Sequence, residues 1–200
     1  MGLAQAQAAA QAIATAAPYA LVTSDLMRAA DTAAPLGVAL GLTPVADQRL
    51  REIALGAWEG LTGDEARERF PDEHAAWRAG EDVRRGGGET YAEAGQRAAA
   101  CLREHLAHAP DGGTLVAVTH GGTARGALGV LLDLPVPDWW RLAPLGNTCW
   151  SVLVEADRGW RLERHNTGLG PLVGPAGGAH DLGTRPVGGT SASPDDESQR

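Results

Sequence analysis

An apolar run that ends in a histidine and two glycines constrains the fold of this chain more than any other segment. Residues 116–122 read Val-Ala-Val-Thr-His-Gly-Gly. The apolar part is typical of a buried strand, and the glycines allow a tight turn into a helix. Ligands of open α/β sheets bind beyond the carboxyl ends of the strands. The sequence therefore places His120 where the chemistry of such a fold is usually carried out.

Predicted helices and strands alternate along most of the chain. Helical spacing of apolar residues and capping signals predict helices at 3–17, 24–40, 62–70, 71–79, 90–108 and 123–132. Strands are predicted at 19–23, 43–47, 116–120, 148–155 and 160–164, the last two being antiparallel. This order predicts an α/β fold, a three-layer α/β/α sandwich with a mostly parallel sheet.

The composition divides the chain into a domain and a tail. Residues 1–167 carry enough apolar side chains for one core, whereas residues 168–200 are rich in Gly, Pro and Ser and are expected to be disordered. No apolar run reaches the ~20 residues that span a bilayer. Because no secretory signal is visible either, a cytoplasmic protein without a membrane partner is predicted. The oligomeric state is left open.

The net charge of −8 argues against nucleic acid as a partner, since no basic stripe exists to neutralise a phosphate backbone. A small phosphorylated substrate needs only a few convergent arginines and remains compatible with this charge. Cys101 and Cys149 are interpreted as buried free thiols. His105 and His108 share one helix face without a third ligand nearby, so no metal site is predicted.

Two charged residues suggest phosphate chemistry. Arg28 lies in the first turn of a helix that follows a strand, where its guanidinium can hold phosphate oxygens through two parallel hydrogen bonds. The alternative is a solvated surface arginine. Glu59 follows Trp58, whose ring could shield the carboxyl group from water, raise its pKa and let it act as a proton donor. Its alternative is an exposed loop carboxylate.

Together these segments resemble the histidine phosphatase superfamily, the phosphoglycerate mutase-like proteins. The similarity covers most of residues 2–167, and the order and spacing of its fragments are more specific than any one of them. The fragments are Gly2-Leu3-Ala4-Gln5-Ala6, Thr23-Ser24-Asp25-Leu26-Met27-Arg28-Ala29, Leu50-Arg51-Glu52-Ile53, Gly56-Ala57-Trp58-Glu59-Gly60, Gly87-Gly88-Glu89-Thr90 and Thr119-His120-Gly121-Gly122.

The resemblance implies hydrolysis of small phosphate monoesters through a phosphohistidine, with no metal or other cofactor. It implies that Arg28 and the backbone at Gly121 hold the phosphate, that His120 stabilises its charge and that Glu59 donates the proton. The remaining residues assigned to the site are expected at the rim of the pocket. They are Glu89, Thr90 and Asn147.

One part of the family pattern is missing from these 200 residues, which contain no Arg-His-Gly. In the family this motif ends the first strand and supplies the nucleophilic histidine. We therefore expect an N-terminally truncated domain without its first strand, impaired or inactive as a phosphatase. A late start site, a gene fragment and a genuine loss all remain open explanations. The alternative function is a non-catalytic module of the same fold that binds a phosphorylated ligand or a protein.

Overall fold

The computed structural model describes residues 2–168, so nearly all of the predicted tail lies outside the described residues. A short parallel sheet lies at its centre. Strand β1 (Ala20–Thr23) pairs on one side with β2 (Val45–Ala46) and on the other with β3 (Leu115–Val118). Thr23 of β1 is in register with Val118 of β3, so the two strands end at the same edge of the sheet.

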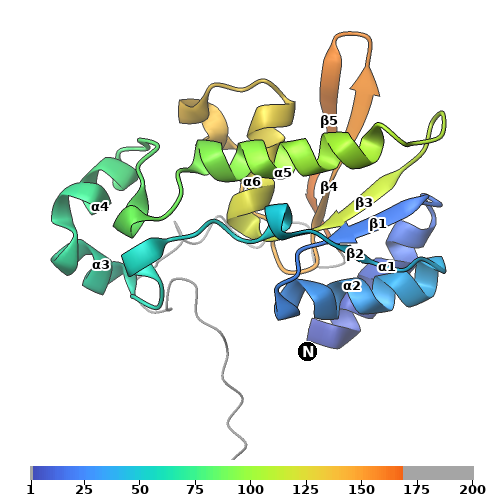
Figure 1. Ribbon diagram of the computed structural model, residues 1–200, viewed down its shortest axis with the longest axis horizontal. Helices are drawn as coiled ribbons and strands as arrows, with labels where there is room; N and C mark the ends of the chain where they lie inside the picture. The colour runs from blue at the N-terminus through green and yellow to red at the C-terminus, as the bar shows by residue number, and fades with distance from the viewer. Residues whose placement is uncertain (1, 169–200) are drawn as a thin grey trace, which may run out of the picture.

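Helices cover both faces of this sheet, which confirms the predicted three layers (Figure 1). On one face α1 (Gly2–Ala14) packs against α2 (Met27–Leu40), and the core there includes Leu21. On the other face α5 (Tyr91–Leu106) packs against α6 (Gly121–Leu131), and that core includes Val22. Neighbouring strand residues point to opposite faces, which is why two adjacent apolar residues in β1 serve two cores.

The interface between α5 and α6 depends on two glycines that face each other. A Cβ added to Gly95 would lie 2.6 Å from the carbonyl oxygen of Gly126, and one added to Gly126 would lie 2.8 Å from the Cα of Gly95. The helix backbones can approach this closely because neither residue has a side chain. The contact fixes the position of α6, whose first residue follows His120.

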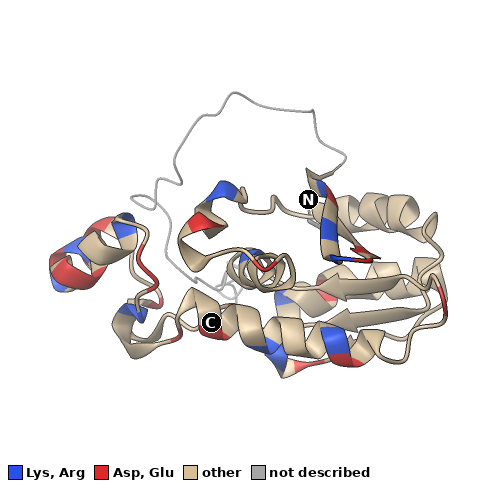
Figure 2. Cartoon of the chain, turned by 90° about the horizontal axis from the view of Figure 1, so that it is seen from above, with Lys and Arg blue, Asp and Glu red and all other residues tan. Residues whose placement is uncertain are grey.

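Two short helices extend from one end of the molecule. Helix α3 (Gly63–Arg69) begins at the predicted Thr62–Glu65 capping box, and α4 (Pro71–Arg78) begins at a proline. Both carry acidic and basic residues, as the outlying helical pair in Figure 2 shows. Their inner side packs around Trp58, which is fully buried.

The second sheet is a difference from the predicted arrangement. Strands β4 (Trp150–Ala156) and β5 (Gly159–Thr167) form an antiparallel hairpin that pairs with no strand of the parallel sheet within the described residues. The predicted strand positions are correct, although β5 continues three residues beyond the predicted end at 164. Strand periodicity predicts that a segment is a strand, but it does not identify its neighbour.

Three other predictions need correction. The prolines at 135 and 137 favour a loop over residues 135–138, but three of these residues belong to a 3₁₀ helix, η4 (Val136–Arg141), whose N-cap is Pro135. Residues 49–60, which the sequence predicts to be an ordered loop, overlap two further 3₁₀ turns, η1 (Gln48–Leu50) and η2 (Gly56–Trp58). Cys101 is buried as predicted, whereas Cys149 is only half-buried.

Among the described residues, no helix is both long and apolar enough to cross a membrane.

Candidate active site

The parallel register of β1 and β3 brings two polar residues together at the sheet edge. Ser24 follows the last residue of β1, and His120 lies two residues beyond the end of β3. The hydroxyl of Ser24 lies 2.9 Å from Nε2 of His120. Both side chains are buried, with exposed fractions of 0 % and 8 %. The edge predicted to carry the chemistry therefore places a histidine and a serine side by side.

Arg28 lies within hydrogen-bonding distance of the same imidazole. Its Nε donates to Nδ1 of His120 at 3.1 Å. Because Nδ1 accepts this bond, the proton of the neutral ring belongs on Nε2, from which it can be donated to Ser24. One hydrogen-bonded chain thus joins α2, β3 and the end of β1.

The protonation of His120 is set mainly by its burial. Loss of solvation lowers the pKa of His120 from 6.5 to about 4, and the positive charge of Arg28 adds to this effect. The carboxylate of Glu52 acts in the opposite direction. His120 is therefore neutral at pH 7 in the ligand-free protein.

The outer part of the Arg28 side chain faces solvent. Arg28 is exposed, and within residues 2–168 its Nη1 and Nη2 atoms take part in no hydrogen bond or ion pair. Nε is used to contact His120, so the two terminal nitrogens remain available as parallel donors. This geometry fits the predicted role of Arg28 in holding the oxygens of an anion.

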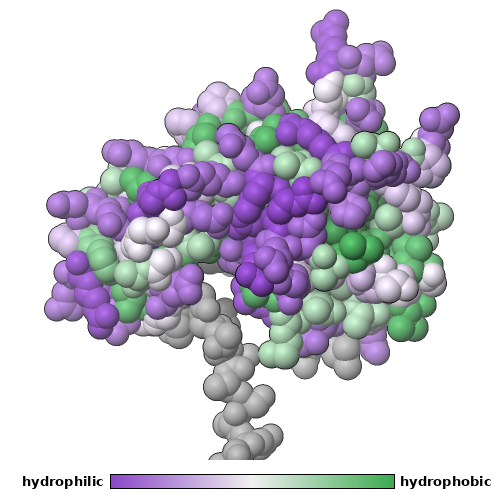
Figure 3. Space-filling view, in the orientation of Figure 1, coloured by the Kyte–Doolittle hydropathy of each residue, from purple (hydrophilic) through white to green (hydrophobic). Residues whose placement is uncertain are grey.

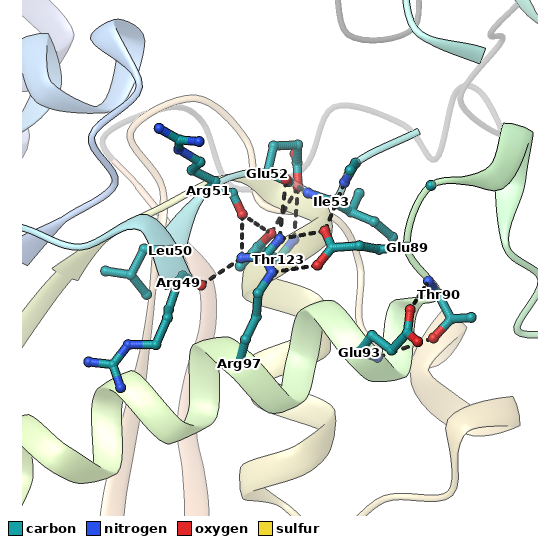
Figure 4. Close-up of polar contacts among 12 residues, drawn as sticks. Arg49, Leu50, Arg51, Glu52, Ile53, Glu89, Thr90, Glu93, Arg97 and Thr123 are labelled. Carbon is teal, nitrogen blue, oxygen red and sulfur yellow. Dashed lines mark hydrogen bonds and ion pairs between the residues drawn. The ribbon is translucent and has the colours of Figure 1, made fainter. Parts of the chain in front are cut away.

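Glu52 anchors the start of α6 next to His120. Its Oε1 accepts the backbone N–H of Thr123 at 3.0 Å, and its Oε2 accepts that of Gly122 at 3.3 Å. The hydroxyl of Thr123 donates to the Arg51 carbonyl at 2.7 Å. Figure 4 shows Glu52 and Thr123 at the centre of this network. A carboxylate satisfies helix N-terminal N–H groups that would otherwise lack partners, and it interacts favourably with the helix dipole.

Arg97 fixes the same segment from the opposite side. From α5 its Nη1 donates to the carbonyls of Arg49 and Arg51, at 2.6 and 2.8 Å. Its Nε and Nη2 bind both carboxylate oxygens of Glu89 at 2.7 and 2.8 Å (Figure 4). Figure 3 shows a hydrophilic band across the face of the molecule along which α5 runs in Figure 1. The segment that carries Glu52 is thus held by a half-buried ion pair.

The two residues predicted at the pocket rim near α5 have structural partners. The Glu89 carboxylate binds Arg97 and also accepts the Ala54 N–H at 2.9 Å. The hydrogen bond from Arg97, and to a lesser extent that from Ala54, lowers the pKa of Glu89. Thr90 is the N-cap of α5, where its hydroxyl accepts the N–H of Glu93 at 3.1 Å. These contacts account for both residues without a ligand.

Glu59 is not joined to His120 or Arg28 by any hydrogen bond within the described residues. It is exposed, and its carboxylate accepts the Leu55 N–H at 3.3 Å. The ring of Trp58 points inward and lies 5.9 Å from each of the rings of His74 and Trp77. The predicted shielding of Glu59 by Trp58 is therefore wrong, because the tryptophan packs into the helical cap instead of covering the carboxyl group.

Of the two remaining predicted residues, Gly121 is half-buried and Asn147 is exposed. Gly121 is the first residue of α6, and a Cβ built on it meets no atom within 4 Å. Open space beside this backbone is compatible with an approaching ligand. Asn147 is exposed in the turn before β4, and its carbonyl accepts the Thr148 hydroxyl at 2.6 Å.

Sequence reasoning missed two residues of this site. Ser24 stands where a serine is typical as a helix cap, and its hydroxyl oxygen accepts the Leu26 N–H at 3.2 Å, but the same hydroxyl also contacts His120. Glu52 lies in the fragment Leu50-Arg51-Glu52-Ile53, to which the family resemblance assigns no role. For Ser24 the signal was its place directly after a strand predicted to be parallel to the strand before His120. For Glu52 no local signal existed, since its partners are about 70 residues away.

Comparison with known proteins gives consistent matches. The family model described as the histidine phosphatase superfamily (branch 1) matches residues 1–168. A glucosyl-3-phosphoglycerate phosphatase of Mycobacterium tuberculosis is 37% identical over 160 residues, covering 76% of this chain and 72% of the relative. The enzyme of the same name from Mycolicibacterium vanbaalenii is 35% identical over 183 residues, covering 83% and 81%.

Solved structures agree with these matches. The mycobacterial glucosyl-3-phosphoglycerate phosphatase in complex with inorganic phosphate superimposes with a TM-score of 0.77 at 36% identity, covering 83% of this chain and 85% of that one. The native form of that enzyme has a TM-score of 0.76 and covers 84% and 86%.

Proposed function

The chain belongs to the histidine phosphatase superfamily, and from this premise we propose that Arg28, Ser24 and His120 bind the phosphate group of a small phosphate monoester. The contact between Nε of Arg28 and Nδ1 of His120, at 3.1 Å, carries this proposal. It leaves both terminal nitrogens of the arginine for the ligand and holds the imidazole at the carboxyl edge of the sheet.

The ring of His120 can respond to an anion. In the ligand-free protein its pKa of about 4 keeps it neutral, with Nε2–H directed at Ser24. A phosphate dianion beside the ring favours the protonated form and raises this pKa. Binding would then couple to proton uptake at Nδ1, which ends the hydrogen bond from Arg28 Nε, and the imidazolium and the guanidinium would both donate to the phosphate and stabilise its charge.

We further propose that residues 1–200 hydrolyse phosphate esters only weakly. Family chemistry transfers the phosphoryl group to the histidine of an Arg-His-Gly motif, which this sequence does not contain. His120 is held by Arg28 on one ring nitrogen and by Ser24 on the other, so it is oriented as a binding group. Because both ring nitrogens of His120 already have hydrogen-bond partners, the geometry also favours the second candidate function, a phosphate-binding module without turnover.

Binding is tested by titrating the protein with inorganic phosphate and with vanadate in a calorimeter. Arg28→Ala should weaken phosphate binding at least about tenfold, since a hydrogen bond to a charged group contributes about 1.5 kcal/mol or more. Arg103→Ala is the matched control, because Arg103 is an exposed arginine on α5 outside the site. Equal phosphate affinity of wild type and Arg28→Ala would disprove the clamp.

Turnover is measured on an aryl phosphate and on glucosyl-3-phosphoglycerate, the compound in the name of the mycobacterial relatives. We expect phosphate binding with little hydrolysis of either compound. Robust hydrolysis that disappears in His120→Gln would instead show that His120 carries the reaction, and the proposal of weak turnover would be wrong.

A further inference from the structure

Three potential metal ligands converge at a second position, behind the segment that carries Glu52. Cys101 and His105 lie one turn apart on α5, and Asp47 directly follows β2. One ligand atom from each residue lies within 4.8 Å of those of the other two. His108, which shares the helix face of His105 in the sequence, does not belong to this group. The two histidines considered in the sequence therefore form no site together, and His105 is instead grouped with Cys101 on the same helix and with Asp47 from a distant part of the chain.

We propose that Asp47, Cys101 and His105 bind a thiophilic divalent cation such as Zn²⁺. Thiolate, imidazole and carboxylate are the donors that zinc prefers, and three protein ligands with one open position form a common tetrahedral arrangement. Zn–S and Zn–N bonds of about 2.3 and 2.0 Å place tetrahedral ligands roughly 3.5 Å apart. The ligand atoms must therefore move together by about 1 Å, which side-chain rotation of the half-buried Asp47 and His105 can supply.

The charges around the three ligands suit a divalent ion. The guanidinium of Arg49 binds the Asp47 carboxylate, with Nη2 at 2.7 Å from Oδ2, and its Nη1 binds Glu104 at 2.7 Å. With Cys101 as thiolate the group has three anions and one cation, so a dication neutralises it. A carboxylate has about four lone-pair positions, so Asp47 can bind the metal while Arg49 continues to orient it.

Metal binding requires the thiol proton to leave. Burial raises the pKa of Cys101 to about 12, so the free protein holds the thiol form. On binding, the S–H bond breaks, an S–metal bond forms and one proton passes to solvent for each metal bound. The ring nitrogens of His105 have no hydrogen-bond partner within residues 2–168, whereas its carbonyl accepts the Tyr19 hydroxyl at 2.8 Å. The imidazole is therefore available on a fixed stretch of helix.

The metal would cross-link two elements that also position the phosphate site. Asp47 begins the segment that continues through η1 to Glu52, and α5 supplies Arg97 to the same segment (Figure 4). A bound ion would therefore stabilise this connection without contacting the phosphate.

The test uses Co²⁺ as a spectroscopic probe on metal-free protein. We expect 1:1 binding with a near-ultraviolet thiolate-to-cobalt band, displacement of cobalt by Zn²⁺, and no displacement by Mg²⁺. Cys101→Ser should abolish the thiolate band, and His105→Ala should weaken binding at least about tenfold, since losses even of outer-shell partners cost 10–100-fold. Circular dichroism of the metal-free variants checks that each is folded.

The matched controls are Cys149→Ser, the other cysteine, and His108→Ala, the neighbouring histidine on the same helix. Both should bind cobalt as the wild type does. Absence of a 1:1 thiolate band, or its loss in Cys149→Ser, would refute the site. If Cys101→Ser does not fold, unchanged cobalt affinity in His105→Ala would refute it equally well.

Discussion

Burial of a single histidine makes the stability of the fold depend on pH. His120 has a pKa of about 4 when folded and an ordinary value of 6.5. Above pH 6.5 the ring is neutral in both states and its contribution is fully present. As the pH falls from 6.5 through 4, the unfolded chain binds a proton that the folded protein does not, so the folded state loses stability.

We expect this loss to be on the order of 2–3 kcal/mol between pH 7.5 and pH 4, because one pKa unit corresponds to 1.36 kcal/mol. Urea unfolding of wild type and His120→Gln at a series of pH values measures it. The variant should lose less stability over this range. His108→Gln, an exposed histidine, is the control and should follow the wild type. Parallel curves for wild type and His120→Gln would contradict the assignment.

Single residues also show how far the sequence alone could predict the site. Arg28 and His120 were predicted from their positions after strand ends, and the structure places them in contact. Glu59 was predicted to have a shielded carboxyl group because Trp58 is adjacent in sequence. Adjacent residues in a turn point in different directions, and only the packing of the helical cap decides which of them is buried.

The packing of helix α5 against α6 depends on one close backbone contact, between Gly95 and Gly126. Ala at position 95 would place its Cβ 2.6 Å from the Gly126 carbonyl oxygen, which is backbone and cannot rotate away. We expect Gly95→Ala to destabilise the protein by about 1–3 kcal/mol, despite the better helix propensity of alanine. Thermal or urea unfolding measures the change.

The control for stability is Gly121→Ala, since a Cβ at this helical glycine meets no atom within 4 Å. It should be neutral or slightly stabilising, as alanine favours the helix. If Gly95→Ala were as stable as Gly121→Ala, the backbones of α5 and α6 would have to be further apart than in this structure.

Elements were the most predictable part of the fold. Helix starts at Thr62 and Pro71 and the helix end at Gly41 follow from local capping chemistry, and the structure confirms all three. The separation of β4 and β5 from the parallel sheet was not predictable, because strand pairing depends on contacts far apart in sequence. The network of Glu52, Arg97 and Glu89 is hidden for the same reason.

At the scale of the whole molecule, the parallel sheet has unequal protection on its two sides. Strand β1 has partners on both edges, whereas within the described residues β3 pairs with β1 alone. Backbone amides without a ladder partner open to solvent more readily. We expect hydrogen exchange, followed by mass spectrometry, to be faster in the β3 segment than in β1. Equal protection of the two strands would show that another segment covers the free edge of β3.

The free edge of β3 offers main-chain N–H and C=O groups to which a further strand could add. An extended peptide that docked there in the same direction as β3 would be held by main-chain groups, whatever its side chains. Its final residues would then arrive beside the imidazole of His120, because parallel strands finish at a common border.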